Sequence, residues 1–383
     1  MNENAGNQMA DDNWLIVDTV LKRVFNGPLR SSQRVAAFDF DGTLVHPKGN
    51  NTHAKSGDDW KFVDPNVPTV LSALHEQGYC VVMLSNQKGI AQNNERRKIF
   101  EERVQRVASC LAFPVLVLAS TEDDSYRKPR RGMWDLMETL LLYPVHVGES
   151  FFVGDAAGRP EVAASLKPKF KKDHSDSDRK FAINVKCKFF TPEGIFRPDL
   201  KQPELPPIIF NPRAYLEDNH GTIALDVFED GQWLIITVGS PGSGKSTFVR
   251  RRFPPDKFTY VSRDDLKTRN KCLKVCQGAL NEGENVVIDN TNADVATRKL
   301  YLDMARKFAN VRTKCLYFTA GWDLCLHNNA LRDKKVPTVA LRMYWSRFEE
   351  PTKGEGFDVI QKVDFVPNFE NEEAERKWSM FYV

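Results

Sequence analysis

Hydrophobic and polar positions fall into two halves with the same arrangement: an apolar run, a charged turn and a helical pattern. In the first half, residues 35–40, 81–84 and 151–153 have the continuous apolar pattern of buried strands. Residues 95–111 lie between them with helical spacing, and residues 14–25 are interpreted as a short helix or a strand. This alternation predicts a parallel sheet covered by helices on both faces.

The second half belongs to the same class but does not repeat the sequence of the first. Residues 233–238, 258–261 and 286–288 are expected to be strands, and residues 245–252 to open a helix. The sequence therefore predicts a second α/β domain built on a parallel sheet.

A proline-rich segment separates the halves. Five prolines lie between Arg197 and Pro212, which indicates an extended linker or a strap over a domain surface. The 383 residues are too many for one ordinary core. We expect an N-terminal extension (1–32), an α/β domain (33–197), a linker (198–222) and a second α/β domain (223–383).

Composition changes this picture little. Apolar residues make up 41% and charged residues 27%, so each half can bury a core, and the net charge of +3 does not by itself identify a polyanionic partner. The seven cysteines form no Cys-x-x-Cys pair, which argues against a zinc site, and their odd number favours a reducing compartment. No apolar run reaches membrane-spanning length, so we expect no membrane association.

A glycine-rich run in the second half has the spacing of a phosphate-binding loop. Residues 239–246 fit Gly-x4-Gly-Lys-Ser between a strand and a helix, where backbone N–H groups converge on an anion. Lys245 is expected to reach the β- and γ-phosphates of ATP, and Ser246 to bind Mg²⁺. The predicted ATP-binding residues are Gly239, Gly242, Ser243, Gly244, Lys245, Ser246 and Thr247.

Two acids follow strands of the second half. Asp264 could orient an acceptor hydroxyl and act as its base, or it could cap the following helix. Asp289 could hold a Mg²⁺-bound water or contact the acceptor, or it too could be a helix cap. The charged segment 331–335 is either a lid whose arginine stabilises phosphoryl charge or a solvated turn.

The strongest signal in the first half is a pair of acids, Asp39 and Asp41, directly after an apolar strand. One carboxylate can attack phosphorus while the other protonates the leaving oxygen and later activates water, and Mg²⁺ offsets the charge repulsion. The alternative is an Asp-Gly turn with two solvent-facing acids.

Supporting residues follow in order, which favours a phosphatase over a turn. Ser85 and Asn86 end a strand and can hold phosphate oxygens, Lys128 supplies a cation, and Asp155 ends a third strand. The predicted metal ligands of this half are Asp39, Asp41 and Asp155.

These elements resemble the haloacid-dehalogenase superfamily of phosphatases. With the phosphate-binding loop downstream, their order resembles the eukaryotic bifunctional polynucleotide kinase 3′-phosphatases, from about Val35 to about Val366. The runs that carry the resemblance include residues 85–90, 126–129, 132–135, 152–160, 191–193, 289–292 and 325–329.

The resemblance implies a Rossmann-like phosphatase domain followed by a P-loop kinase domain. Asp39 is then the nucleophile, Asp41 the general acid/base, and either Asp173 or Asp178 a further acid of the metal site. In the kinase it implies Asp264 as the base, Arg332 as the lid arginine and Lys267 as a cation near the acceptor. Ser262 stands where the family often has asparagine, and the lid spacing is not identical.

By the same resemblance the substrates are DNA ends with a 3′-phosphate or a 5′-hydroxyl, and we expect a nuclear monomer. Vertebrate members carry an N-terminal phosphopeptide-binding domain that docks repair scaffolds. Only about thirty residues precede the phosphatase here, so we do not expect docking by that route.

Three alternatives stay open: an RNA end-healing enzyme, a fusion of a metabolite phosphatase with a small-molecule kinase, and a non-catalytic scaffold that binds nucleic acid. Intact Asp39, Asp41, Lys245 and Asp264 speak against the scaffold. The basic segments 127–131 and 167–172 favour a nucleic acid over a metabolite, unless they are solvated faces.

Overall fold

The computed structural model divides the chain into two compact units, residues 1–208 and 209–381. The structure describes residues 13–30, 32–49, 51–141, 143–161, 172–200, 204–219 and 231–382. Among these residues, no helix combines the length and the apolar character needed to cross a membrane.

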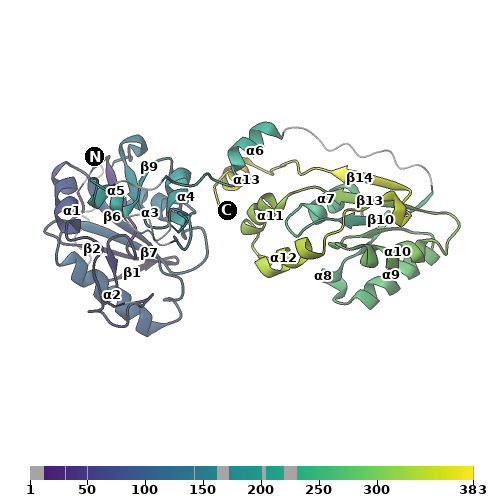
Figure 1. Cartoon of the computed structure of the whole chain (residues 1–383), viewed down its shortest axis with the longest axis horizontal. Coiled ribbons are helices and arrows are strands. Elements are labelled where there is room, and N and C mark those ends of the chain that lie inside the picture. Colours follow the sequence, from purple (N-terminus) through teal and green to yellow (C-terminus); the bar gives the residue numbers. More distant parts are fainter. Residues whose placement is uncertain are drawn as a thin grey trace, which may run out of the picture. The chain divides into compact units, whose positions relative to one another are not determined.

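The first unit is built on a sheet of seven strands within the described residues, in the order β1-β2-β7-β6-β3-β8-β9 (Figure 1). The five strands from β7 to β9 run parallel, and β2 and β1 extend the sheet antiparallel. The strands are β1 (Leu15–Val17), β2 (Val20–Phe25), β3 (Val35–Phe38), β6 (Cys80–Asn86), β7 (Val115–Ser120), β8 (Phe151–Val153) and β9 (Lys188–Phe190). A small hairpin of β4 (Val45–His46) and β5 (Lys61–Phe62) follows β3.

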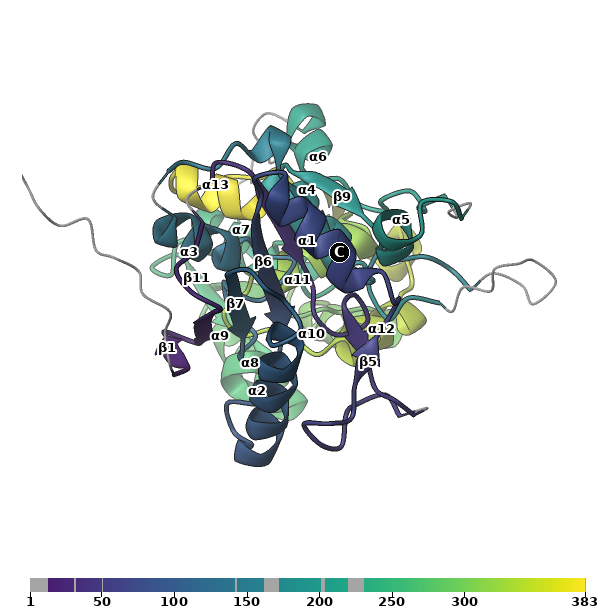
Figure 2. The ribbon, with the colours of Figure 1, turned by 90° about the vertical axis from the view of Figure 1, so that its left-hand side faces the viewer.

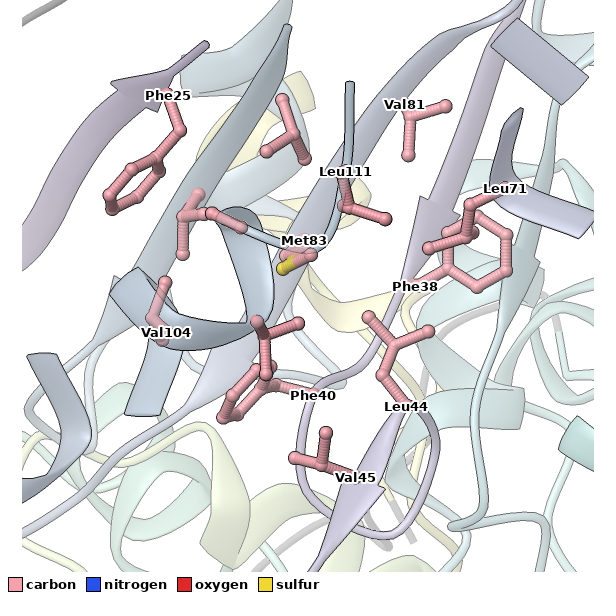
Figure 3. Close-up of a cluster of buried hydrophobic side chains, with 14 of the residues drawn as sticks. Phe25, Phe38, Phe40, Leu44, Val45, Leu71, Val81, Met83, Val104 and Leu111 are labelled. Carbon is pink, nitrogen blue, oxygen red and sulfur yellow. The ribbon is translucent and has the colours of Figure 1, made fainter. Parts of the chain in front are cut away.

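Successive residues of a strand point to opposite faces of the sheet, so both faces of this sheet are apolar. Helices cover each face and form a separate core with it. Phe38 belongs to the core under α1 and α2, and its neighbour Ala37 to the core under α3 and α4. Figure 3 shows the first core, with Phe38, Leu71 and Val104 among its members, and Figure 2 shows α1 lying in front of β6. The helices are α1 (Val67–Glu76), α2 (Asn94–Ala108), α3 (Gly132–Leu140), α4 (Ser177–Val185), α5 (Pro192–Phe196) and the 3₁₀ turn η1 (Val147–Glu149).

The N-terminal boundary differs from the prediction. Part of the segment that we set apart as an extension forms β1 and β2, which belong to the sheet of the first unit. Strand β2 pairs with β7 along its whole length, from Val20 opposite Ser120 to Phe25 opposite Val115. Its apolar ends are buried in both cores, so these residues are part of the domain; residues 1–12 lie outside the described part.

The second unit contains a fully parallel five-stranded sheet in the order β11-β12-β10-β13-β14. The strands are β10 (Gln232–Val238), β11 (Phe258–Val261), β12 (Asn285–Ile288), β13 (Val311–Phe318) and β14 (Val359–Val363). The helices are α6 (Pro212–Asp218), α7 (Lys245–Arg252), α8 (Arg263–Leu266), α9 (Arg269–Asn281), α10 (Val295–Ala305), α11 (Trp322–Ala330), α12 (Thr338–Arg347), α13 (Glu372–Trp378) and the 3₁₀ turn η2 (Lys353–Glu355). The prediction of two parallel-sheet α/β domains is confirmed.

The predicted linker also differs in part, because helix α6 belongs to the second unit. Tyr215 of α6 packs at the edge of a core cluster that contains Leu324 and Trp378, and its hydroxyl donates to the carbonyl of Phe365 at 2.8 Å. Pro212 starts this helix and Asn211 caps it, so proline here marks a helix start instead of an extended strap. Residues 201–203 and 220–230 lie outside the described part of the chain.

Candidate active sites

Three carboxylates meet at the carboxyl edge of the first sheet. Asp39 follows β3, Asp155 follows β8, and Asp178 lies in the first turn of α4. One oxygen from each lies within 4.8 Å of the others. Oxygen ligands clustered this closely suit a hard divalent cation such as Mg²⁺.

The sequence left Asp173 and Asp178 as alternatives, and the structure brings only Asp178 into this triad. Asp173 instead accepts from the guanidinium of Arg159, at 2.9 Å from Nε and 3.0 Å from a terminal nitrogen. It also accepts the backbone N–H groups of Ala157 and Arg159. Asp173 therefore organises the loop after β8.

The ammonium of Lys128 lies between two members of the triad, 2.6 Å from Asp39 and 2.8 Å from Asp178. Burial by itself would lower the pKa of Lys128, but the carboxylates of Asp178 and Asp39 outweigh it and raise the pKa above its usual value. These contacts favour the charged form of the ammonium and hold it where a phosphoryl group would contact Asp39.

Burial is the largest influence on the pKa values of two acids of the triad, Asp39 and Asp155. It raises the pKa of Asp39 to about 7, with Lys128 acting in the opposite direction. It raises the pKa of Asp155 to about 8, with further contributions from the charges of Asp39 and Asp178. Crowded acids with raised pKa values favour a bound cation, which stabilises their ionised forms.

Thr43 is a site residue to which the sequence analysis gave no role. Its buried hydroxyl accepts the backbone N–H of Asp155 at 3.0 Å and donates to the carboxylate of Asp155 at 3.3 Å. The adjacent Gly42 has a φ of +84°, and a Cβ there would lie 2.5 Å from the same carboxylate. The loop after β3 therefore needs a glycine to approach Asp155, and the Gly-Thr pair after two acids was the available signal.

Asp41 lies outside the triad, which differs from its predicted place among the metal ligands. One carboxylate oxygen accepts from Arg103 at 2.6 Å and the other from the side-chain amide of Gln87 at 2.7 Å. Its side chain is 43% exposed, whereas that of Arg103 is 6% exposed. Asp41 is therefore reachable from solvent and beside Asp39 in the chain, as an acid/base requires.

The predicted phosphate-binding pair of β6 has divided roles. The buried hydroxyl of Ser85 contacts Gln87 and lies at the carboxyl edge of the sheet, where a phosphate oxygen could reach it. The amide of Asn86 instead donates to the carbonyl of Lys128 at 3.0 Å and accepts its N–H at 2.9 Å. Asn86 thus positions the backbone of Lys128, a role that the sequence analysis did not foresee, and its phosphate contact stays a prediction.

The basic segment 127–131 is not a free cationic surface. Lys128 is buried, Arg130 pairs with Asp123 at 3.0 Å, and Arg131 pairs with Asp135 at 2.6 Å. Most of the other basic segment, residues 167–171, lies outside the described part. The described segment gives the nucleic-acid interpretation little support.

In the second unit, the loop between β10 and α7 has the backbone of a phosphate-binding loop. Gly242 and Gly244 have φ values of +88° and +86°, and a Cβ on Gly242 would lie 2.3 Å from the carbonyl of Cys325. Lys245 at the start of α7 donates to the carbonyls of Gly239 and Ser240 at 2.8 and 2.9 Å. Burial lowers the pKa of Lys245 to about 8, so the ammonium lies in an apolar setting that an anionic phosphate would favour.

The other predicted ATP-binding residues follow this loop. Ser243 is buried and its hydroxyl has no hydrogen-bond partner among the described residues; Ser246 is half-buried and Thr247 is exposed. Ser243 and Ser246 therefore have hydroxyl groups available to a ligand.

Three predicted kinase residues lie close enough to Lys245 to act on its charge. Asp289 and Asp264 favour the ammonium, and Arg332 disfavours it. The charges of the predicted lid arginine and of both candidate acids therefore act at the ammonium of the phosphate-binding loop.

Helix capping, the alternative for both acids, is performed by other residues. Ser262 caps α8 by accepting the N–H of Asp264, and Asp294 caps α10 by accepting the N–H of Thr297. Asp289 lines a cavity of about 380 Å³ and has a buried oxygen without a hydrogen-bond partner in the described structure. The cavity is also lined by Arg250, Pro255, Tyr260, Ser262 and Asp265.

Lys267 follows the last residue of α8 with a positive φ of 68°, and its ammonium donates to the carbonyl of Asp264. It therefore stabilises the short helix that carries the candidate base. The sequence analysis missed Asn328 of α11, which donates to the carbonyl of Gly242 at 2.8 Å and accepts from the indole of Trp378 at 2.8 Å. These contacts tie the phosphate-binding loop to α11 and α13.

Comparison with known proteins agrees with this architecture. Residues 34–196 match the family model described as polynucleotide kinase 3 phosphatase, and residues 234–351 match an AAA domain model. A bifunctional polynucleotide phosphatase/kinase of Schizosaccharomyces pombe is 32% identical over 366 residues, covering 94% of this chain and 86% of the relative.

Two further relatives extend the comparison. A putative bifunctional polynucleotide phosphatase/kinase of Acanthamoeba polyphaga mimivirus is 32% identical, covering 92% of this chain and 90% of the relative. A polynucleotide 3′-phosphatase of Arabidopsis thaliana is 34% identical over 50% of this chain and 28% of the relative. With both domains matched in order over most of its length, the chain belongs to the family of bifunctional polynucleotide phosphatase/kinases.

Proposed function

We propose that this bifunctional polynucleotide phosphatase/kinase repairs DNA ends in the nucleus. It removes 3′-phosphates and transfers the γ-phosphate of ATP to 5′-hydroxyls, which gives ends that a ligase can join. The observation that carries the phosphatase half is the Lys128 ammonium, held 2.6 Å from Asp39 at the edge of a three-carboxylate cluster. The preference for DNA and the nuclear location rest on the family resemblance.

In the phosphatase, an oxygen of Asp39 attacks phosphorus while the bond to the 3′-oxygen breaks. Asp41 gives its proton to that oxygen, then accepts a proton from the water that hydrolyses the aspartyl-phosphate. Lys128 and Ser85 hold the phosphoryl oxygens. Mg²⁺, held by Asp39, Asp155 and Asp178, would neutralise the charge that the phosphate brings to these acids.

In the kinase, the backbone of residues 239–244 and the ammonium of Lys245 hold the phosphates of ATP. Ser246 is the residue placed to bind the Mg²⁺ that accompanies the nucleotide. Asp264 accepts the proton of the 5′-hydroxyl, and Arg332 stabilises the charge of the transferring phosphoryl group. Asp289, which lines the neighbouring cavity with an unpartnered oxygen, contacts the acceptor in this proposal.

Two substitutions in the full chain test this assignment. Asp39→Ala should abolish 3′-phosphatase activity and leave 5′-phosphorylation intact, and Lys245→Ala should do the reverse, because the two sites lie in different units. Loss of both activities in either folded variant would contradict the two-site proposal.

Matched oligonucleotides test the substrate. DNA and RNA strands with a 5′-hydroxyl or a 3′-phosphate should be compared, with free nucleotides as competitors. DNA ends should react best, with a KM that rises with salt as counterions are released. Equal or better activity on RNA would identify an RNA end-healing enzyme. Equal activity on free nucleosides would contradict the proposal that the substrate is a polynucleotide.

A further inference from the structure

Helix α12 of the kinase unit exposes apolar side chains on its solvent side. Val339 is 62% exposed, Met343 is 49% exposed and Trp345 is 36% exposed. Val339 and Met343 are four residues apart and share a helix face with Arg342. Water is a poor solvent for such a surface, so this face is a candidate contact surface.

Cations surround these apolar side chains. Residues 332–347 contain Arg332, Lys334, Lys335, Arg342 and Arg347 against a single acid, Asp333. This 16-residue stretch therefore carries a net charge of +4, whereas the whole chain of 383 residues carries only +3. Apolar side chains among cations match a single-stranded nucleic acid, which offers apolar base faces between phosphates.

The helix is held in a defined place relative to the phosphate-binding loop. Asn329 closes the segment between α11 and α12 by donating to the carbonyl of Val336 at 2.8 Å and accepting its N–H at 2.9 Å. Leu341 of α12 is buried in the same cluster as Cys325 of α11, and Figure 1 shows the two helices as neighbours. The contact of Asn328 with Gly242 then connects α11 to the loop.

The basic stretch begins where α11 ends, close to the contact of Asn328 with the phosphate-binding loop. Its first residue, Arg332, follows the C-cap of α11 and donates its backbone N–H to the carbonyl of Asn329 at 3.3 Å. A strand whose 5′-end lies at the phosphate-binding loop would therefore have α12 within reach of its next nucleotides.

We infer that the exposed face of α12, formed by Val339, Arg342, Met343 and Arg347, binds the acceptor strand next to its 5′-end. The bases contact Val339 and Met343, and Arg342 and Arg347 contact the phosphates. This inference rests on the proposed kinase function, because it places the nucleotides adjoining the hydroxyl that accepts phosphate. A two-fold contact between copies of this chain fits the face less well, because it would bring the same cations opposite one another.

Two double variants of the full chain test the inference: Val339→Ser with Met343→Ser, and Arg342→Gln with Arg347→Gln. Each should raise the KM for a 5′-hydroxyl oligonucleotide about tenfold, because base packing or phosphate contact is lost. The KM for ATP and the activity on a nucleoside 3′-monophosphate, which is too short to reach α12, should stay within about twofold of wild type. The arginine variant should also weaken the salt dependence of the KM by about one contact per arginine.

Matched controls are Leu300→Ser on α10 and Arg376→Gln on α13, which remove an exposed apolar side chain and an exposed cation elsewhere on the same unit. Both should behave as wild type, and retained phosphorylation of the nucleoside 3′-monophosphate reports that the kinase unit of every variant is folded. The inference is overturned if the α12 variants leave the oligonucleotide KM unchanged, or raise the KM for ATP equally. It is also overturned if they only dissociate a dimer in sedimentation. A wild-type chain that phosphorylates no polynucleotide would instead overturn the proposed function.

Discussion

The guanidinium of Arg103 in α2 donates a hydrogen bond of 2.6 Å to the carboxylate of Asp41 in the loop after β3, although the two residues are 62 positions apart in the chain. Arg103 is buried and its guanidinium packs over the ring of Phe40, 5.2 Å from the centroid. The exposed carboxylate of Asp41 is therefore oriented from a fixed anchor inside the domain, with Gln87 holding its second oxygen.

Arg103→Met should remove that anchor while keeping much of the buried apolar volume. We expect kcat on a 3′-phosphate to fall about tenfold to a hundredfold with little change in KM. Part of the rate enhancement by an acid/base depends on the orientation of its carboxyl group. Arg103→Lys should restore part of the rate. Combined with Asp41→Asn, the loss of Arg103 should cost little more, because the residue that it positions has already lost its proton. Additive losses in this double-mutant cycle would show that Arg103 acts only through stability.

Asp178 and Asp173 form a second matched pair. Asp178→Asn should raise the Mg²⁺ concentration needed for half-maximal phosphatase activity about tenfold to a hundredfold, because it weakens a ligand of the triad. Asp173→Asn should instead lower the thermal stability of the phosphatase unit, since it weakens the pairing of a buried guanidinium. Metal titrations and melting curves of both variants distinguish these effects. A larger change in Mg²⁺ dependence for Asp173→Asn would reverse the assignment.

The sequence predicted the parallel core strands and the phosphate-binding loop because these depend on local patterns. Residues 151–153 and 258–261 were expected to be strands and are β8 and β11. Strand β2, which lies between β1 and β7, was ambiguous, because its half-buried Lys22 and Arg23 break the apolar alternation. Only its pairing with β7 makes it part of the domain.

Side-chain roles that depend on distant contacts could not be predicted. Asn86 follows a strand as a phosphate ligand would, but its partners are backbone groups of Lys128, 42 residues away. Arg103 lies in a helix rich in charged residues and resembles a solvated position until α2 packs on the sheet. Asp173 and Asp178 are equivalent by spacing, and only the position of α4 separates them.

Asp294 and Asp289 allow capping and acceptor contact to be separated in the kinase unit. Burial would raise the pKa of Asp294, but its hydrogen bonds to Thr297 outweigh that effect and the pKa is lowered. Asp294→Ala should therefore destabilise the unit by about 0.5–2 kcal/mol at neutral pH, the usual cost of losing an N-cap. A lowered folded-state pKa makes this contribution complete above the unfolded value near 4 and lost as the pH falls through the folded value.

Urea unfolding at neutral pH and at acidic pH measures this difference. Asp289→Asn is the matched control: it should reduce 5′-phosphorylation without the same loss of stability, because an oxygen of Asp289 is buried without a partner among the described residues. If Asp294→Ala lowers the free energy of unfolding equally at both pH values, the claim that Asp294 caps α10 in its ionised form is wrong.

The role of Asp41 can be separated from that of Asp39 by changing the leaving group. Asp41→Asn keeps the shape of the side chain but removes the proton that the leaving 3′-oxygen needs. The rate on a 3′-phosphate should therefore fall by about 10²- to 10⁴-fold, the usual contribution of a positioned acid/base. p-Nitrophenyl phosphate has a leaving group that needs little protonation, so the rate on this substrate should fall much less.

One exception to that difference can be recognised from the kinetics. If hydrolysis of the aspartyl-phosphate becomes rate-limiting, Asp41→Asn will also be slow on p-nitrophenyl phosphate, because the base that activates water is missing. A burst of p-nitrophenol, equal in amount to the enzyme, would then precede the slow phase. Asp39→Asn should be inactive on both substrates and give no burst, because it cannot form the covalent bond. Equal losses for Asp41→Asn on both substrates without a burst would assign the proton transfer to another residue.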